Sequence, residues 1–309
     1  MKKIDDRVYV TYMYPIQFIV NENENIDFTM EEINRLSYDH SLLCRIIGTI
    51  NNTYDGKQVE YLVCGDGALG IMEKENIDID NIVFHFNDLL CKMLIGGISV
   101  EAITNEDIVT GSIHNSKAIW PVQFGHSWNS HIHAELRMKV TGVTNAIFLY
   151  KTEKNTITID WLKSALEKGD KIIKTIPNLS TYHLIKGITD YRYRNWSSTL
   201  TFLWVVVEEI IDYLWKCNIT DKVSGNNSRK RKDALNDSRT YTTAVKQEVL
   251  FQKQILSEEL YNDIFVARQA RNKLIHEGKR ISESDASKVY KFVLEMLSIV
   301  SEEETEIKR

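Results

Sequence analysis

The sequence predicts an α+β protein in which a strand-rich N-terminal domain is followed by a C-terminal bundle of four helices. Three observations lead to this prediction. Before residue 150, several segments combine β-branched and aromatic residues with partial alternation of apolar and polar positions, as strands do. After residue 177, apolar residues recur every three or four positions, as helices require. The length of 309 residues favours two domains over one.

The N-terminal domain is expected to span residues 1–177. Its clearest strands are residues 8–12, 58–63 and 146–150. A polar stretch ending in Asp-Gly, residues 51–56, indicates a hairpin-like break. The short apolar stretch at residues 89–95 is consistent with a helix that Gly96 and Gly97 end.

Proline places the boundary between the two domains. The apolar pattern is helical from residue 159 to residue 176 and stops at Pro177, because a proline disfavours helical backbone in the residue before it. The helical domain is therefore expected to span residues 178–309. Its first long helix covers residues 196–216, where leucine, valine and isoleucine recur at helical spacing.

A polar segment separates this helix from the next. Residues 224–232 have neither an apolar period nor apolar bulk, so we expect a loop. A second helix is expected over residues 241–254.

Capping signals delimit the last two helices. Ser257 can cap a third helix, which Gly278 is well placed to stop. Ser282 and Asp285 have the spacing of a capping box at the start of a fourth helix. Four helices with short or medium connections favour an antiparallel bundle.

Composition excludes several classes of protein. The chain is 43% hydrophobic and 26% charged, which is ordinary for a globular protein. No apolar run reaches the roughly 20 residues that span a bilayer, and no signal-like segment follows Met1, so we expect a cytoplasmic protein without membrane contact. Four scattered cysteines without a CxxC pair favour reduced thiols. The net charge of -5 is more acidic than is usual for a dedicated nucleic-acid binder.

Pattern and chemistry disagree at residues 271–276, which read Arg-Asn-Lys-Leu-Ile-His and close the third helix before Glu-Gly. At 100° per residue, Arg271 lies about 20° from the centre of the apolar seam formed by Leu260, Ile264, Ala267 and Leu274. An unpaired buried charge costs several kcal/mol. Arg271 therefore needs an acidic partner, a dimer partner or an anionic ligand such as phosphate.

The helical domain resembles the HEPN superfamily. The resemblance rests on a helical bundle whose third helix ends in Arg271, Asn272 and His276, a pattern similar to the Arg-x(4–6)-His motif of HEPN ribonucleases. Leu203, Trp204 and Glu208 on the first helix are similar to the Apea-like and abortive-infection branches. The resemblance covers about residues 180–300 and does not extend to the N-terminal domain.

The resemblance implies a metal-independent endoribonuclease that needs no cofactor. In such enzymes the ribose 2′-hydroxyl attacks the adjacent phosphate, generally leaving a cyclic phosphate. A histidine side chain ordinarily titrates near neutral pH, so His276 is expected to act as the general acid or base. Arg271 can hold a phosphate in a bidentate fork. Asn272 shares a helix face with His276 and can orient the imidazole or contact the ribose.

The resemblance also implies a homodimer. Arg271 and His276 point about 140° apart on an ideal helix, and we expect the helix terminus and dimerisation to overcome this separation. A second stripe, formed by Tyr261, Phe265, Asn272 and His276, has no evident intramolecular partner and could pack against its twin. In the family, two motifs face each other across the dimer and form one site.

Further residues are candidates for supporting roles. Glu208 lies at the margin of its helix's apolar arc, where it could pair with Arg271 or position His276, or could simply be a solvated edge residue, whereas Glu209 points away. Cations next to the motif and cations in the polar segment could bind RNA phosphates, or could simply be solvated. These residues are Lys273, Lys279, Arg280, Arg229, Lys230, Arg231 and Lys232.

Two alternatives stay open. The helical domain could be a non-catalytic dimerisation or binding module, with the function residing in the N-terminal domain. The histidines His126, His131 and His133, together with Glu135, could instead bind zinc or manganese. The favoured interpretation is an antiphage abortive-infection or toxin effector that cleaves RNA, with an N-terminal domain that responds to a phage-derived or cellular trigger.

Overall fold

The computed structural model describes residues 7–16, 18–22, 45–75, 77–114, 118–121, 156–305 and 307. The chain forms an α+β fold with two compact units, one extending to Gly169 and the other beginning at Asp170. The division falls within helix α5 (Ile159–Thr175), slightly before the boundary expected at Pro177.

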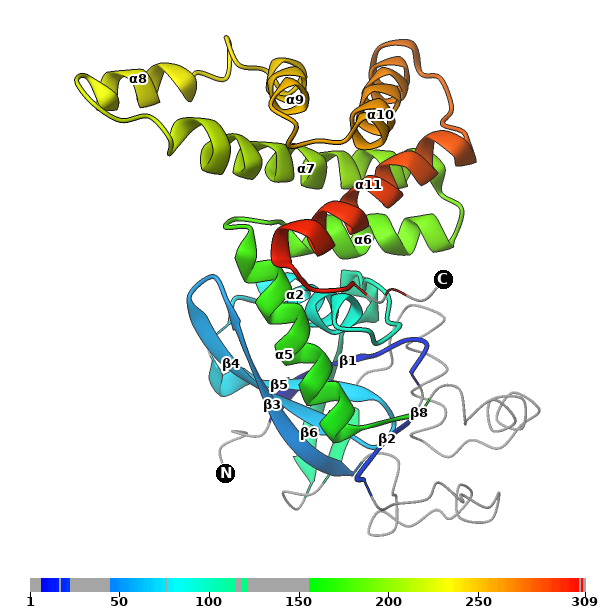
Figure 1. The fold of residues 1–309 in the computed structure, drawn as a ribbon. Coiled ribbons are helices and arrows are strands. Elements are labelled where there is room, and N and C mark those ends of the chain that lie inside the picture. The colour runs from blue at the N-terminus through cyan, green and yellow to red at the C-terminus, as the bar shows by residue number, and fades with distance from the viewer. Residues whose placement is uncertain are drawn as a thin grey trace. The chain divides into compact units, whose positions relative to one another are not determined.

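The N-terminal unit contains a six-stranded antiparallel sheet in the order β3-β4-β5-β1-β6-β7 (Figure 1). The strands are β1 (Arg7–Tyr12), β3 (Ile46–Tyr54), β4 (Lys57–Cys64), β5 (Ala68–Met72), β6 (Val109–His114) and β7 (Ala118–Pro121). The sheet curves into a half-barrel, and a single bridge between Arg45, which precedes β3, and Ala118 of β7 joins its two edges. Separately, β2 (Phe18–Val20) pairs in parallel with β8 (Thr156–Thr158).

Alternating strand residues form the core inside the curved sheet. These are Val8, Val10, Tyr12, Leu62, Cys64, Ala68, Val109 and Ile119. The strands expected at residues 8–12 and 58–63 are confirmed as β1 and β4, whereas residues 146–150 lie outside the described part. The hairpin turn is shorter than expected. Asp55 and Gly56 alone form it, with φ of 48° and 72°, because two residues with positive φ suit the twist of a hairpin.

Helix α2 (Ile82–Ile95) begins earlier than the apolar stretch suggested, because its first two turns carry buried polar residues. Asp88 and Lys92 form a buried ion pair at 2.8 Å. Asn52 of β3 donates to Asp88 and accepts from Lys92, both at 2.8 Å. These partners satisfy the charges within the core.

Two glycines let α2 and α5 approach closely. A Cβ atom added at Gly96 would lie 1.9 Å from the carbonyl oxygen of Ala165, and one added at Gly169 would lie 1.8 Å from that of Lys92. Only glycine fits at either position without moving a backbone, so these two residues set the spacing of the helices.

The helical unit contains the four expected helices and, among the described residues, two further α-helices that were not predicted from the sequence. The expected ones are α7 (Trp196–Trp215), α9 (Thr243–Gln252), α10 (Glu258–Glu277) and α11 (Glu283–Ser301). The first addition, α6 (Thr181–Arg192), is capped by Ser180 and packs on α7. A Cβ at Gly187 would lie 2.5 Å from a methyl group of Leu203, which reflects how tightly this pair packs.

The second addition corrects a prediction. Residues 224–232 were expected to be a loop, but from Ser228 onward they belong to helix α8 (Ser228–Leu235), in which no residue is buried. Arginine, lysine, alanine and leucine favour helix without needing a buried face. The helix is fixed at its end, because the indole Nε1 of Trp215 donates to the carbonyl oxygen of Leu235 at 3.1 Å.

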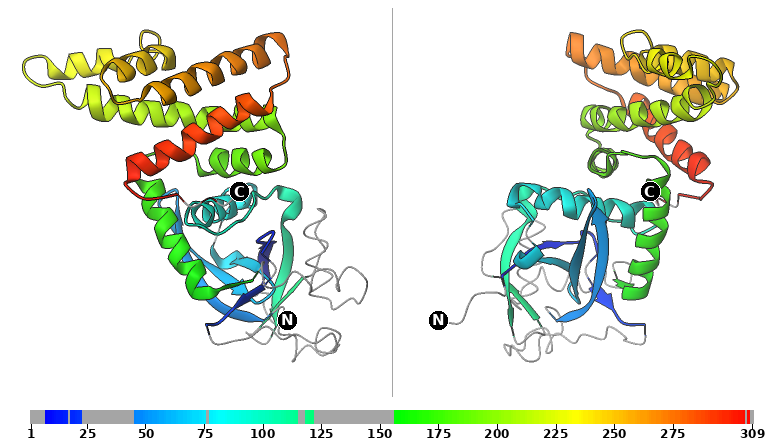
Figure 2. Two further views of the ribbon diagram at one scale, coloured as in Figure 1. Left: turned by 45° about the vertical axis from the view of Figure 1, so that its right-hand side comes forward. Right: turned by 90° about the vertical axis from the view of Figure 1, so that its left-hand side faces the viewer.

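Helix α8 and the C-terminal end of α10 lie near opposite ends of α7. Trp215, which bonds to α8, is the last residue of α7. Ile281, which follows α10, donates its backbone N–H to Ser197 Oγ near the first residue of α7. Figure 2 (left) accordingly shows α8 and the C-terminal end of α10 at opposite ends of the helical unit. No described helix has the length and apolar character needed to cross a membrane.

Candidate functional site

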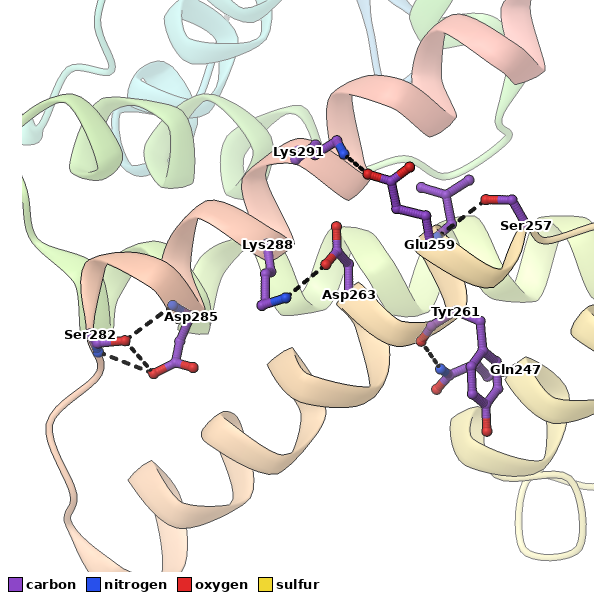
Figure 3. A network of polar contacts seen from close by, with 10 residues as sticks. Gln247, Ser257, Glu259, Tyr261, Asp263, Ser282, Asp285, Lys288 and Lys291 are labelled. Carbon is purple, nitrogen blue, oxygen red and sulfur yellow. Dashed lines mark hydrogen bonds and ion pairs between the residues drawn. The ribbon is translucent and has the colours of Figure 1, made fainter.

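Helix α10 begins at the expected cap and is fixed through its first two turns. Ser257 Oγ accepts from the backbone N–H of Leu260 at 3.2 Å. Asp263 binds Lys288 of α11 at 2.9 Å, and Glu259 binds Lys291 of the same helix (Figure 3). Within the described part, every hydrogen bond or ion pair that joins α10 to α9 or α11 involves a residue between Glu259 and Asp263.

The other end of α10 leaves the core, which corrects the expected burial of Arg271. Leu260, Ile264 and Ala267 are buried, as the apolar seam predicts. Arg271 and Leu274 are only partly buried, whereas Ile275 is 53% exposed. The apolar residues of the seam continue toward the end of α10, but neighbouring elements bury only the earlier ones. Arg271 therefore reaches solvent and needs no buried counter-charge.

The motif residues occupy this uncovered end. Arg271 Nη1 donates to Asn272 Oδ1 at 3.3 Å, and Arg271 forms no ion pair with any described residue. Asn272 and His276 are both exposed. The side chains share one end of the helix but do not converge in a single chain.

The helix terminus does not relieve the separation of Arg271 and His276. Regular helix continues through Glu277, and only Gly278 adopts the left-handed conformation, with φ of 64°. Its N–H donates to Leu274 O at 3.1 Å and thereby ends the helix as expected. The two motif side chains therefore keep the angular separation of an ideal helix, about 140°.

Glu208 and Arg271 are not brought together. Glu208 Oε1 instead accepts from the indole Nε1 of Trp204, one turn earlier on α7, at 2.8 Å. Glu209 faces α6, where it accepts the backbone N–H of Ser180 at 2.8 Å. Burial raises the pKa of Glu209, although the Ser180 hydrogen bond lowers it in part. The expected pairing of Glu208 with Arg271 is absent because Trp204 holds the carboxylate.

The second stripe of α10 is partly used within the chain, which corrects another expectation. Tyr261 donates its hydroxyl to Glu248 of α9 at 2.6 Å, and its ring lies 4.6 Å from that of Phe251. Only Asn272 and His276, further along the stripe, remain exposed. Helix α9 therefore covers the first half of the stripe and leaves the second half open to a partner.

The cations expected to bind RNA form two separate groups. Lys273, Lys279 and Arg280 are exposed beside the motif, and Lys279 binds Glu277 at 2.7 Å. This ion pair lowers the pKa of Glu277. The second group, Arg229, Lys230, Arg231 and Lys232, lies on α8 at the other end of α7. Because α7 has 20 residues, its two ends, near which the groups lie, are about 30 Å apart.

Arg268 was not among the residues predicted from the sequence. It lies one turn before Arg271, and its guanidinium carbon is 5.3 Å from the centre of the Phe265 ring. Its Nη1 atom is buried and has no hydrogen-bond partner in the structure. The signal in the sequence was the spacing of two arginines by three residues, which places them on neighbouring positions of one helix face.

The residues of the alternative metal site, His126, His131, His133 and Glu135, lie outside the described residues. No protein-family model, curated protein or solved structure matches the chain.

Proposed function

We propose that the protein is a metal-independent endoribonuclease of the HEPN type. The observation that carries the proposal is the position of Arg271 and His276 on the uncovered end of α10. Arg271 has no carboxylate partner among the described residues, so its charge is available to a phosphate. His276 is exposed to solvent one turn later.

The reaction would use these groups without a cofactor. His276 takes the proton of a ribose 2′-hydroxyl, whose oxygen attacks the adjacent phosphorus. The bond from phosphorus to the 5′-oxygen breaks, and the leaving oxygen takes a proton from water. Arg271 stabilises the charge that develops on the phosphoryl oxygens. The products are a 2′,3′-cyclic phosphate and a 5′-hydroxyl.

The angular separation of Arg271 and His276 supports a dimeric site. One helix cannot direct both side chains at the same phosphate, but two helices related by a twofold axis can contribute one residue each. Ile275 supports the same arrangement, since an aliphatic side chain between the motif residues is 53% exposed and would be covered by a second copy. Asn272 is placed to contact the ribose or the partner's imidazole.

The division into two units suggests how the ribonuclease activity is regulated. We infer that the N-terminal half-barrel unit responds to a phage-derived or cellular trigger and restrains the helical unit until the trigger is present. The protein would then be a cytoplasmic abortive-infection or toxin effector. An unrestrained ribonuclease is harmful to the cell that makes it, which gives such a restraint its purpose.

Cleavage of RNA by the purified full-length chain tests the proposal. The wild-type protein should cleave a labelled RNA, and both His276→Ala and Arg271→Ala should lose at least about 100-fold in rate. Gln269→Ala, an exposed change on the same helix, is the matched control and should cleave normally. Chelator should have no effect.

Equal cleavage by wild type and His276→Ala would overturn the site. Loss of activity in chelator would favour the histidine-rich segment around His131 instead. Growth offers a second readout, because expression of the wild type should slow growth and expression of His276→Ala should not. If neither cleavage nor toxicity is found, a non-catalytic dimerisation module is the better interpretation.

A further inference from the structure

Arg268 has a guanidinium that the fold holds in place without neutralising it. The ring of Phe265, one turn earlier, supports the guanidinium at 5.3 Å. The Nη1 atom is buried yet has no hydrogen-bond partner. A buried donor without an acceptor is costly, so such groups in folded proteins commonly have a ligand or a function.

No carboxylate of α10 is placed to neutralise Arg268 or Arg271. The positions three and four residues away from these arginines hold no aspartate or glutamate. The carboxylates of α10 that form ion pairs all bind lysines. The pairs are Glu259 with Lys291, Asp263 with Lys288 and Glu277 with Lys279.

Arg268 and Arg271 are adjacent on the helix and only partly buried, so the accessible part of each side chain can meet an anion. Residues three apart on a helix have Cβ atoms about 5–6 Å from each other. Two like charges at this spacing destabilise the helix, and a bound anion removes the repulsion. A guanidinium presents several donors in a rigid fork that matches the oxygens of a phosphate, so the chemistry of the pair favours phosphate groups.

We infer that Arg268 binds a phosphate of the RNA backbone adjacent to the one that Arg271 holds. The inference rests on the proposed ribonuclease function and adds a substrate-binding residue to it. Arg268 lies toward the interior of α10 relative to the motif, so RNA would run along α10 from the motif toward α9. Phe265 keeps the guanidinium in position before RNA binds, which reduces the entropy that binding must overcome.

The inference is tested by the affinity of the full-length protein for an RNA that cannot be cleaved. All 2′-hydroxyls of this RNA are methylated, and binding is measured by fluorescence anisotropy over a range of salt concentrations. Arg268→Met is the informative variant, because methionine keeps apolar contact with Phe265 but has no charge. We expect roughly tenfold weaker binding, equivalent to about 1.4 kcal/mol. The slope of log affinity against log salt should fall by about 0.7, the value for one phosphate of a single strand.

Three further variants separate binding from packing. Arg268→Lys keeps the charge and should retain the salt slope, but it loses the fork and should bind less tightly than wild type. Gln269→Ala and Arg239→Ala, both exposed in the wild type, should bind as wild type does. Thermal unfolding should show the same midpoint for Arg268→Met and wild type within a few degrees.

The outcomes also separate this inference from the proposed function. If Arg268→Met binds RNA with wild-type affinity and salt slope while the wild type cleaves RNA, Arg268 has no role in binding and the nuclease stands. If Arg268→Met binds weakly but no form of the protein cleaves RNA, the phosphate site stands and the nuclease does not. A wild type that binds no RNA overturns both.

Discussion

The guanidinium of Arg271 donates from Nη1 to Oδ1 of the neighbouring Asn272 at 3.3 Å. The acceptor is neutral, so the contact restricts the side chain without cancelling its charge. Elsewhere on the same helix, Glu259, Asp263 and Glu277 each bind a lysine. Arg271 therefore has a neutral partner, whereas these charged residues are paired with opposite charges. This leaves the charge of Arg271 available to a ligand.

A carboxylate in place of Asn272 should inactivate the site. Asn272→Asp gives Arg271 a charged partner and places a negative charge near the RNA phosphate. We expect the rate of RNA cleavage to fall at least about tenfold, because the guanidinium is neutralised. Asn272→Ala removes the contact without adding charge and should lose less. Initial rates on a labelled RNA measure both, and equal losses in the two variants would show that charge is not the cause.

A charge at Ile275 should separate the dimer. Ile275 is 53% exposed beside the motif, and Ile299 of α11 is 55% exposed and serves as the matched control. We expect Ile275→Asp to be monomeric and to have lost nearly all cleavage, because each site needs residues from two copies. Ile299→Asp should remain dimeric and active. Light scattering during size-exclusion chromatography gives the mass, and an active monomeric Ile275→Asp would contradict the composite site.

The cations of α8 should matter for long RNA only. They lie about 30 Å from the motif, which a stacked strand spans in about nine nucleotides. Replacing Arg229, Lys230 and Arg231 by glutamine should lower the salt slope for a 20-nucleotide RNA by about 2, and should leave the cleavage of a six-nucleotide RNA unchanged. Asp233→Asn controls for changes to α8 itself. Equal loss on both RNAs would place the effect on folding instead of binding.

Helix α8 is an element that the sequence pattern could not predict. Strands β1 and β4 and helices α5, α7, α10 and α11 were predicted because each buries a face, and burial leaves a period of apolar residues, whereas β3, β5, β6 and β7 were not predicted. Helix α8 buries no residue, so it has no such period. Helix α6 was missed because threonine, tyrosine and isoleucine, which are weak helix formers, make up much of it.

The candidate site was predictable in part for a similar reason. Helical periodicity placed Arg271 in line with Leu260 and Ile264, and that alignment holds. It could not show that α9 and α11 are fixed to the first half of α10, which leaves the motif uncovered. Nor could it show that Trp204 holds Glu208, because the geometry of a side-chain hydrogen bond has no periodic signature.

Glu209 makes the stability of the helical unit dependent on pH. Burial raises its pKa from the ordinary value of 4.5. At pH values between 4.5 and the raised pKa, the folded chain holds more protons than the unfolded chain. The free energy of unfolding therefore falls as the pH rises through this range. The penalty is fully present once the pH exceeds the raised pKa. Glu209→Gln keeps an acceptor for the Ser180 N–H without the charge. We expect its melting temperature to exceed that of wild type by about 2 °C at pH 7 and by much less near pH 4, where the Glu209 carboxyl is mostly protonated. Thermal unfolding followed by circular dichroism at the two pH values provides the measurement, and a gain that is equally large at pH 4 would assign the effect to packing and not to charge.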